Sequence, residues 1–207
     1  MGAVEPDLPL FPLAIVALPG EDVPLHLFEE RYKALAADCL DQDREFGIVL
    51  SDDDGPRAVG CAMRIVEVLQ RFDDGRLDVL TRGTRPFRVV EEHHVHTYAS
   101  AEVEFLDDEP EALDHDAAAA VRQAYVSLAR QATDHEVTPA DLVDAGAYAL
   151  AGTVEFAVDV KQQMLEARSE NARLRQLLAL LRGALKRLEF ADMAKVRSAS
   201  NGVVRFG

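Results

Sequence analysis

Cysteine is scarce in this sequence: Cys39 and Cys61 are the only two among 207 residues. Neither belongs to a CxxC pair or to the spacing of a zinc site, so the usual signs of a disulfide framework or a thiolate metal centre are missing. We expect both to be reduced thiols buried in the fold, where free cysteine is most often found.

Long apolar runs are also missing. No stretch approaches the roughly 20 apolar residues that span a bilayer. Residues 1–7 carry Glu5 and Asp7 but no basic segment of the kind that opens a secretory signal. Hydrophobic residues make up 48% of the chain and charged residues 29%, which is typical of a globular protein. We expect a cytoplasmic protein without a membrane partner.

Basic residues are few relative to acidic ones, 22 against 37, and the net charge is −15. Because nucleic-acid affinity depends chiefly on neutralising phosphates, this balance argues against a nucleic-acid partner. Residues 161–187 are the exception, with seven basic and two acidic side chains. We expect this segment to dock on the acidic remainder of the chain or to stay solvated, rather than to form an anion site.

Catalytic signatures are absent as well. The sequence has no GxxxxGK[ST] loop, whose backbone N–H groups and lysine hold nucleotide phosphates. It has no GxSxG elbow, HExxH pair or kinase signature either. We therefore expect that the chain is not an enzyme and binds no cofactor.

The sequence does contain a proline-punctuated N-terminal segment, residues 8–35. Its short apolar runs, which include 13–18 and 23–28, are separated by prolines at positions 9, 12, 19 and 24. Proline lacks the N–H that a central strand uses, so these runs predict edge or bent strands joined by a turn at Pro19-Gly20. A helix is then predicted over about residues 29–41, because apolar residues recur at helical spacing at Phe28, Tyr32, Leu35 and Cys39.

Short strands fill the rest of the first half of the chain. They are predicted over residues 45–51, 59–71, 76–90 and 97–106. Asp73-Asp74-Gly75 is a hairpin turn between the two middle strands, and Gly83 indicates a bulge. Short, bent strands with one early helix predict an α+β fold built on a small antiparallel β-barrel, closed or half-closed.

Helical composition begins within the acidic stretch 102–116. We predict a β-barrel subdomain over residues 1–108, a helical subdomain over 109–193 and a loose tail over 194–207. Helices are expected over residues 111–133, 139–152, 158–167 and 169–190. The last of these has a wide apolar stripe that favours a bundle core over a dimer zipper, made of Leu174, Leu177, Leu178, Leu180, Leu181, Leu185 and Leu188.

The N-terminal segment resembles the opening of the Lon protease N-terminal (substrate-binding) domain, whose pattern is LPLxPLxxxVLxPGxxxPLxIFExRYxxL. The matching residues are Leu8, Pro9, Leu10, Pro12, Leu13, Pro19, Gly20, Pro24, Leu25, Phe28, Glu29, Arg31, Tyr32 and Leu35. The resemblance continues through FGIVL at 46–50, the hairpin at 72–89 and, more weakly, the C-terminal helices.

This resemblance implies a PUA-like antiparallel β pseudobarrel followed by a C-terminal α-helical bundle. In Lon enzymes an ATPase module and a Ser-Lys peptidase module carry out the chemistry, and this sequence ends where the first of these would begin. The resemblance therefore implies the non-catalytic recognition domain alone. Its partner would be a polypeptide, either an unfolded segment or a partner protein.

Such binding would use an apolar groove or an exposed strand edge that accepts an extended peptide. The candidate binding residues are His26, Arg31, Tyr32, Arg82, Arg85 and Phe87. His26 lies in the matched motif, where it could cap a groove or pack beside the barrel.

Four arginines cluster around the hairpin and the bulge: Arg76, Arg82, Arg85 and Arg88. They could clamp a peptide carboxylate, because guanidinium binds carboxylate bidentately. They could equally pair with the abundant Asp and Glu side chains of the same chain. Both alternatives stay open at the level of sequence.

A second hypothesis places an enzyme or ligand-binding site on the same barrel, at His93, His94 and His96 or at the bulge of residues 82–85. On an extended strand Glu92, His94 and His96 would share a face, and imidazole with carboxylate suits zinc or iron. One short strand rarely supplies a full set of ligands, so we expect an exposed polar strand end and no metal site.

Overall fold

The computed structural model describes residues 2–53, 55–132 and 137–201. The chain divides into two compact units, which we describe separately. Unit 1 comprises Met1–Glu111 and Ala147–Glu170, and unit 2 comprises Ala112–Gly146 and Asn171–Gly207. The division into subdomains at residue 108 stays a prediction, and the contacts group residues 147–170 with the strands.

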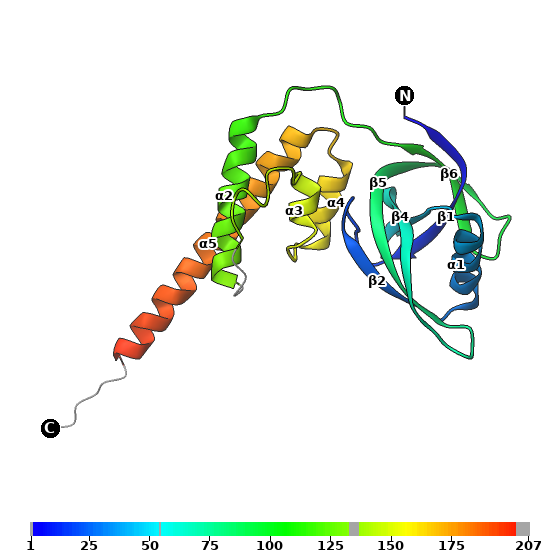
Figure 1. Ribbon diagram of the computed structural model, residues 1–207, viewed down its shortest axis with the longest axis horizontal. Coiled ribbons are helices and arrows are strands. Elements are labelled where there is room, and N and C mark those ends of the chain that lie inside the picture. The colour runs from blue at the N-terminus through cyan, green and yellow to red at the C-terminus, as the bar shows by residue number, and fades with distance from the viewer. Residues whose placement is uncertain (1, 54, 133–136, 202–207) are drawn as a thin grey trace. The chain divides into compact units, whose positions relative to one another are not determined.

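Unit 1 contains six strands and three helices (Figure 1). The strands are β1 (Val4–Leu13), β2 (Asp22–Leu27), β3 (Phe46–Asp52), β4 (Gly55–Arg71), β5 (Leu77–His93) and β6 (Ala99–Phe105). The helices are α1 (Glu30–Gln42), α3 (Ala147–Ala151) and α4 (Val158–Glu166).

The strands form one sheet in the order β2-β5-β4-β3-β1-β6, and an additional pairing of β5 with β6 closes a ring. The predicted α+β fold with one early helix is confirmed, although the ring is not a regular barrel. One pair, β1 with β3, is parallel, where only antiparallel pairs were expected. The chain returns to the same end of the sheet through β2 and α1, and such a crossover permits a parallel pair.

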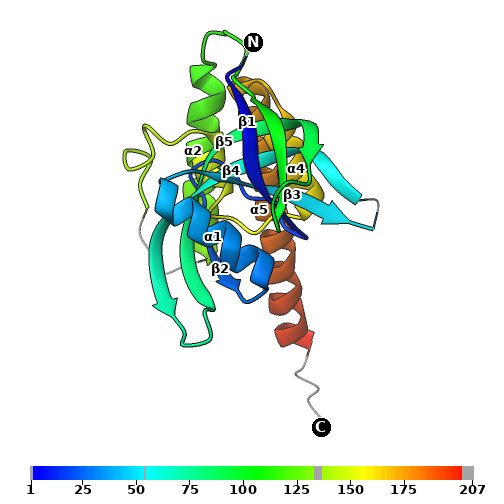
Figure 2. The same ribbon diagram turned by 90° about the vertical axis from the view of Figure 1, so that its right-hand side faces the viewer.

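The predicted hairpin is confirmed: β4 and β5 pair antiparallel on either side of the Asp73-Asp74-Gly75 turn. Gly75 has a φ of +83°, a conformation that glycine adopts without strain. Figure 2 shows the far end of this hairpin projecting beyond the rest of the ring.

The predicted bulge in β5 is also confirmed. Ala62 faces Arg85 and Met63 faces Gly83, so the residue between them on β5 is unpaired. The Gly20 N–H donates to the Gly83 carbonyl at 2.8 Å, and the Gly83 N–H donates to the Glu21 carbonyl at 2.9 Å. A Cβ on Gly83 would lie 2.1 Å from the Leu18 carbonyl oxygen. The Pro19-Gly20 turn and the bulge thus lock together at a position that only glycine fits.

The core of the ring is centred on Phe87, which is fully buried. Added Cβ atoms on Gly47 and Gly60 would lie 2.4 Å and 2.7 Å from its Cζ, so two glycines make room for the ring. The same cluster contains Leu8, Leu10, Val49, Ala62, Ala101, Val103 and Phe105.

Helix α1 buries Tyr32, Leu35 and Cys39 as the spacing predicted. Phe28 was wrongly placed in that stripe, because α1 begins only at Glu30 and Phe28 is 60% exposed. The strand expected over residues 13–18 is also wrong: β1 ends at Leu13, and the segment continues as irregular chain with a buried end at residues 16–18.

Helix α4 packs on the start of β4, where the Gln162 side chain donates to the Val59 carbonyl at 3.1 Å. The helix expected over residues 139–152 is wrong for most of its length, since only Ala147–Ala151 is helical. The Asp141 carboxylate instead accepts hydrogen bonds from the Thr138 N–H and hydroxyl at 2.9 Å and 2.7 Å. Such local bonds stabilise a turn at the expense of a helix.

Unit 2 contains α2 (His115–Ala132) and most of α5 (Glu170–Asn201). The Asn171 side chain accepts from the Asp114 N–H and donates to the Ala112 carbonyl, both at 2.8 Å. The buried stripe of α5 consists of Leu174, Leu177 and Leu181, which is shorter than predicted. Helix α5 includes residues 194–201 of the expected tail, and 202–207 lie outside the described residues.

Over the part of the chain that the structure describes, no helix combines the length and the hydropathy that crossing a membrane requires. Both cysteines are unpaired and buried. Burial raises the pKa of the Cys39 thiol to about 12 and that of Cys61 still further in the same direction. The predicted burial of both thiols is confirmed.

Candidate peptide-binding surface

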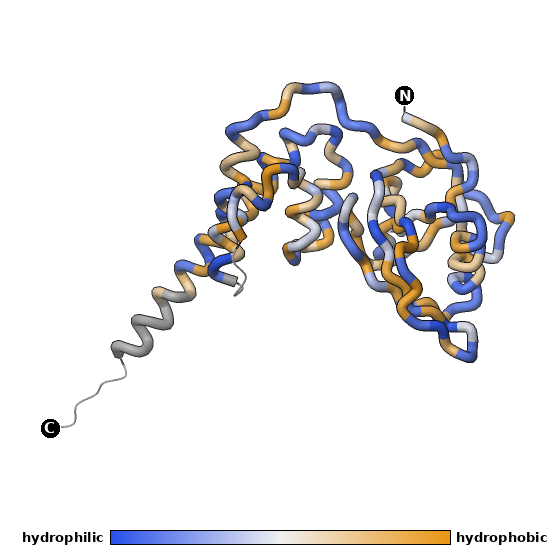
Figure 3. The backbone as a smooth tube through the Cα atoms, in the orientation of Figure 1, coloured by the Kyte–Doolittle hydropathy of each residue, from blue (hydrophilic) through white to orange (hydrophobic). Residues whose placement is uncertain are grey.

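Exposed apolar and aromatic side chains gather where β2 ends beside the β4–β5 hairpin. We call this surface the hairpin patch, and it consists of Pro24, Leu25, His26, Phe28, Leu69 and Phe72. Phe28 is 60% exposed and Leu69 51% exposed. A hollow of about 340 Å³ lies within the patch, lined by Pro24, Leu25, His26, Leu69, Gln70 and Asp78. Figure 3 shows apolar chain along both strands of the hairpin until close to its polar tip.

The alternation of side chains along β2 explains how Pro24 and His26 reach the surface. Successive side chains of a strand point to opposite faces, so Leu27 faces the core at 3% exposure while His26 faces away from it. Phe28 follows directly and ends the strand just before α1. Strand β2 lies at one end of the sheet order, where its single neighbour in that order is β5. Pro24 suits such an edge because it has no N–H to donate.

His26 lies between two aromatic rings. Its ring stacks on Phe28 with centroids 5.9 Å apart and meets Phe72 edge-on, also at 5.9 Å. Its Nδ1 lies 2.5 Å from the Asp78 Oδ1. The carboxylate holds the imidazole in one orientation, so the patch presents three rings in a fixed arrangement.

A second hollow, of about 180 Å³, is lined mainly by charged residues. We call it the arginine pocket, and it consists of Glu5, Leu8, Arg44, Glu45, Arg64, Arg85 and Phe105. The Arg85 Nη2 lies 3.3 Å from the Glu45 Oε2, and the Arg64 Nη2 lies 3.9 Å from the Glu45 Oε1. The Arg85 guanidinium carbon sits 3.4 Å from the centroid of the Phe105 ring. The pocket joins a charged mouth to an apolar wall.

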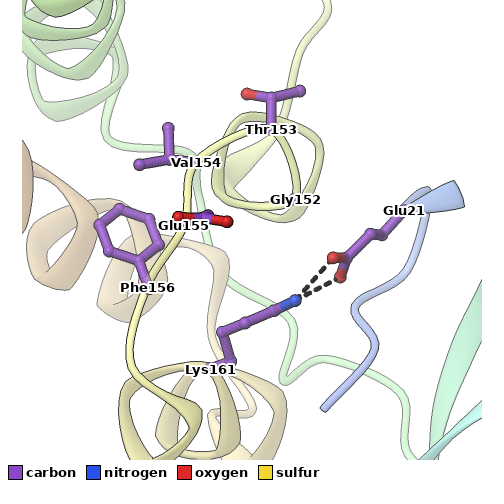
Figure 4. Close-up of a pocket in the computed structure, with 7 residues that line it drawn as sticks. All are labelled: Glu21, Gly152, Thr153, Val154, Glu155, Phe156 and Lys161. Carbon is purple, nitrogen blue, oxygen red and sulfur yellow. Dashed lines mark hydrogen bonds and ion pairs between the residues drawn. The ribbon is translucent and has the colours of Figure 1, made fainter. Parts of the chain in front are cut away.

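A third hollow, of about 200 Å³, lies beside the loop of residues 152–156. Figure 4 shows Lys161 reaching from α4 to the Glu21 carboxylate. Its Nζ lies 2.6 Å and 2.8 Å from the two carboxylate oxygens, and the side chains are 14% and 15% exposed. Glu21 also accepts the Leu18 N–H at 2.9 Å. This ion pair is well satisfied and joins α4 to the Pro19-Gly20 turn, so we assign it a structural role.

The structure does not bring the six predicted binding residues together. Tyr32 is 7% exposed and packs against Phe11, and Phe87 is fully buried. Arg31 is exposed and pairs with Glu29 at 2.8 Å, and Arg82 pairs with Asp22. Only two of the six fall in a described surface feature: His26 in the hairpin patch and Arg85 in the arginine pocket.

Each of the four hairpin arginines pairs with a different acidic residue of the same chain, which was one of the two alternatives for this cluster. Their partners are Asp74 for Arg76, Asp22 for Arg82, Glu45 for Arg85 and Glu104 for Arg88. The Arg82 pair is bidentate, with distances of 2.6 Å and 2.9 Å. This bond lowers the pKa of Asp22 and raises that of Arg82.

The histidine segment does not continue as a strand. Strand β5 ends at His93, so Glu92, His94 and His96 do not share a strand face as the alternative metal-site hypothesis required. His96 instead bonds through Nε2 to the Asp7 Oδ2 at 2.8 Å, and His93 Nδ1 lies 3.8 Å from the other oxygen. Among the residues that the structure describes, no three His, Cys, Asp or Glu side chains are placed to share a metal ion.

Residue patterns alone missed several residues of these surfaces. Phe28 and Leu69 were assigned to helical and strand packing, and Arg44 and Arg64 drew no attention. Arg64 reaches Glu45 because β3 and β4 pair with Phe46 opposite Met63. Only the register of that pairing, which residue types do not reveal, could have indicated the contact.

Comparison with known proteins agrees with this fold. The profile of the family described as ATP-dependent protease La (LON) substrate-binding domain matches residues 7–183. Among solved structures, a Lon N-terminal domain protein from Xanthomonas campestris is similar, with a TM-score of 0.65 and 30% identity over 84% of this chain and 97% of that one. The N-terminal domain of the Mycobacterium avium complex Lon protease, at 21% identity, has the same fold, with a TM-score of 0.68 and the same coverage.

Curated relatives include Lon protease 2 of Myxococcus xanthus, 27% identical, and Lon protease of Anaeromyxobacter dehalogenans (strain 2CP-C), 26% identical. Each alignment covers 94% of this chain but only 25% of the relative. The chain thus spans about a quarter of the length of the Lon proteases it matches. From the match over most of its residues and the shared ring of strands, we conclude that the chain belongs to the LON substrate-binding domain family.

Proposed function

We propose that this chain is a non-catalytic recognition module that binds polypeptide, either an unfolded segment or a partner protein, on its hairpin patch. The observation that carries the proposal is the exposure of Phe28 and Leu69 beside the aromatic ring of His26. Contiguous exposed apolar surface of this kind is typical of interaction sites. The family's description as a substrate-binding domain supports the same function.

The chemistry of the patch fits an unfolded chain. Unfolded segments expose the aliphatic and aromatic side chains that a native protein buries, and burying them against rings stabilises a complex. Aromatic residues carry a large share of the binding energy at protein interfaces. We infer that Phe28 and His26 are the main contacts, and that Leu69 contributes further apolar surface beside the hollow.

Only part of the β2 edge can pair with an extended peptide through main-chain hydrogen bonds. An edge strand can pair with a peptide through main-chain hydrogen bonds. Pro24 removes one donor from that edge, and proline is one of the residues that protect edges from indiscriminate pairing. We therefore assign the binding energy to side chains of the hairpin patch and propose that the strand edge orients the peptide.

The proposal is tested by measuring the affinity of the full chain for a permanently unfolded protein, such as a reduced and carboxymethylated globular protein, by fluorescence anisotropy. A Phe28→Ser substitution is expected to weaken binding at least about fivefold, the usual effect of removing an aromatic anchor. Phe190→Ser is the matched control, because Phe190 is 63% exposed and lies on α5, outside the patch.

Neither substitution removes a buried side chain, so both variants should keep the melting temperature of the parent. If the parent chain fails to bind, or if both variants lose affinity equally, the hairpin patch is not the binding surface.

A further inference from the structure

We propose that the arginine pocket binds the terminal carboxylate of a polypeptide chain, with a small apolar last side chain against Leu8 and Phe105. The inference rests on the proposed function, since it names the chain terminus as a ligand of the same unit. The pocket shares no residue with the hairpin patch, so the two sites can be tested separately.

The charge of the lining favours a single negative ligand. The pocket contains three guanidinium groups, from Arg44, Arg64 and Arg85, and two carboxylates, from Glu5 and Glu45. The chain as a whole carries a net charge of −15, so this excess of one positive charge runs against the composition. A third carboxylate, Asp43, pairs with Arg64 at 3.3 Å from outside the lining, but it is 89% exposed, so water screens much of its charge.

The arginines hold their own carboxylates loosely. Charge-assisted bonds between guanidinium and carboxylate are normally about 2.7–2.9 Å long, whereas the Glu45 oxygens lie 3.3 Å from Arg85 and 3.9 Å from Arg64. Arg64 also lies 3.3 Å from the Asp43 Oδ1, and Arg44, which lies 4.0 Å from Glu5, donates to the Asp7 carbonyl oxygen. The pair of Arg82 with Asp22 is tighter and bidentate, at 2.6 Å and 2.9 Å. Arg64 and Arg85 thus retain N–H donors for a further carboxylate.

Access and pre-organisation both suit a ligand arriving from solvent. The side chains of Arg64 and Arg85 are 48% and 49% exposed, whereas Glu45 is only 14% exposed beneath them. The Arg85 guanidinium already lies over the Phe105 ring at 3.4 Å. A stacked guanidinium is fixed in its plane, so less freedom is lost when it binds a carboxylate.

The size of the pocket limits the ligand. Sites for drug-sized molecules usually enclose about 300–1,000 Å³, and this hollow has about 180 Å³. Its apolar wall is formed by Leu8 and Phe105, which are 2% and 5% exposed. The space therefore fits a carboxylate with a small apolar side chain, the chemistry of a chain terminus.

The test uses the full chain and two fluorescein-labelled glycine–serine peptides that end in leucine, one with a free carboxylate and one with an amide. Anisotropy is expected to show that the free acid binds about tenfold more tightly than the amide, the usual effect of a charge-assisted bidentate bond. Arg85→Met should abolish this preference. Arg85→Lys should lose most of it, because lysine keeps the charge without the fork geometry.

Arg88→Met is the matched control, because Arg88 lies on the same strand, is 50% exposed and pairs with Glu104 outside the pocket. It should keep the preference, and circular dichroism should show that all variants remain folded. Equal binding of acid and amide by the parent chain, or equal losses in Arg85→Met and Arg88→Met, would overturn the inference.

Free propionate separates a chain terminus from a small free acid. It is expected to displace the peptide acid only at concentrations far above the peptide Kd, and displacement at the peptide Kd would assign the pocket to small acids instead. Loss of the hairpin-patch interaction in Phe28→Ser leaves the acid–amide difference unchanged. Failure of the proposed function and failure of this inference therefore give different results.

Discussion

At the scale of single residues, the matched motif consists largely of positions that shape the ring. Gly83 admits the Leu18 carbonyl, and Gly47 and Gly60 admit the Phe87 ring. Tyr32, a candidate for binding because of its place in the motif, is buried against Phe11. The residues free to contact a ligand, Phe28 and His26, lie at the end of β2 where the motif passes from strand to helix.

Gly83 should be intolerant of any side chain. Gly83→Ala places a Cβ 2.1 Å from the Leu18 carbonyl oxygen, so the free energy of unfolding is expected to fall by about 1–3 kcal/mol or more, as in overpacked cores. Gly183→Ala is the control, because nothing lies within 4 Å of its added Cβ. In a helix that change should stabilise by about 0.5–1 kcal/mol. Urea unfolding measures both, and equal stability of the two variants would refute the locking of turn to bulge.

Elements were predictable where a local signal sets the geometry. The hairpin follows from Asp73-Asp74-Gly75, and α1 follows from the spacing of Tyr32, Leu35 and Cys39. Elements that depend on distant partners were not predictable: Phe28 continues the helical spacing yet lies outside α1, and the parallel pairing of β1 with β3 has no local signal. For the same reason, the arginine pocket could not be assembled from residue spacing.

Helix α4 should depend on its partly buried ion pair with the Pro19-Gly20 turn. Lys161→Met leaves the Glu21 carboxylate, 15% exposed, without its cation. Leaving a partly buried charged group without its partner is expected to cost about 1–3 kcal/mol. Arg82→Met breaks an exposed pair, 53% and 43% exposed, and should lower the stability much less. Adding Glu21→Gln to Lys161→Met should recover part of the loss in urea unfolding, and no recovery would argue against coupling.

The connection between β5 and β6 should respond to pH through Asp7 on β1. Burial alone would raise the pKa of Asp7, but hydrogen bonds such as that from His96 and the charge of Arg44 lower it below its ordinary value of 3.8. A lowered folded-state pKa gives stability that is present above pH 3.8 and lost as pH falls further. Asp7→Asn should therefore be less stable than the parent at pH 7, and the difference in melting temperature should shrink below about pH 4. If the difference in melting temperature between Asp7→Asn and the parent stayed constant down to about pH 2, the ionised Asp7 carboxylate would not be the source of the stability.

At the scale of the whole molecule, a net charge of −15 coexists with two surfaces of opposite character in unit 1: an apolar hairpin patch and an arginine pocket with excess positive charge. The acidic remainder repels polyanions, and the two surfaces offer an unfolded chain apolar contacts and a carboxylate site. Both surfaces lie in unit 1, and all of their residues except Glu5 fall within the range 7–183 that the family profile matches. The central claim is that polypeptide recognition resides in unit 1.

Hydrogen–deuterium exchange of the full chain, with and without a saturating unfolded polypeptide, tests this claim most directly. Ordered contacts with a ligand slow exchange of the amides they cover. Protection is predicted over residues 22–28 and 66–80, which carry the hairpin patch. An unchanged pattern over both segments, or protection confined to α2 and α5, would contradict it.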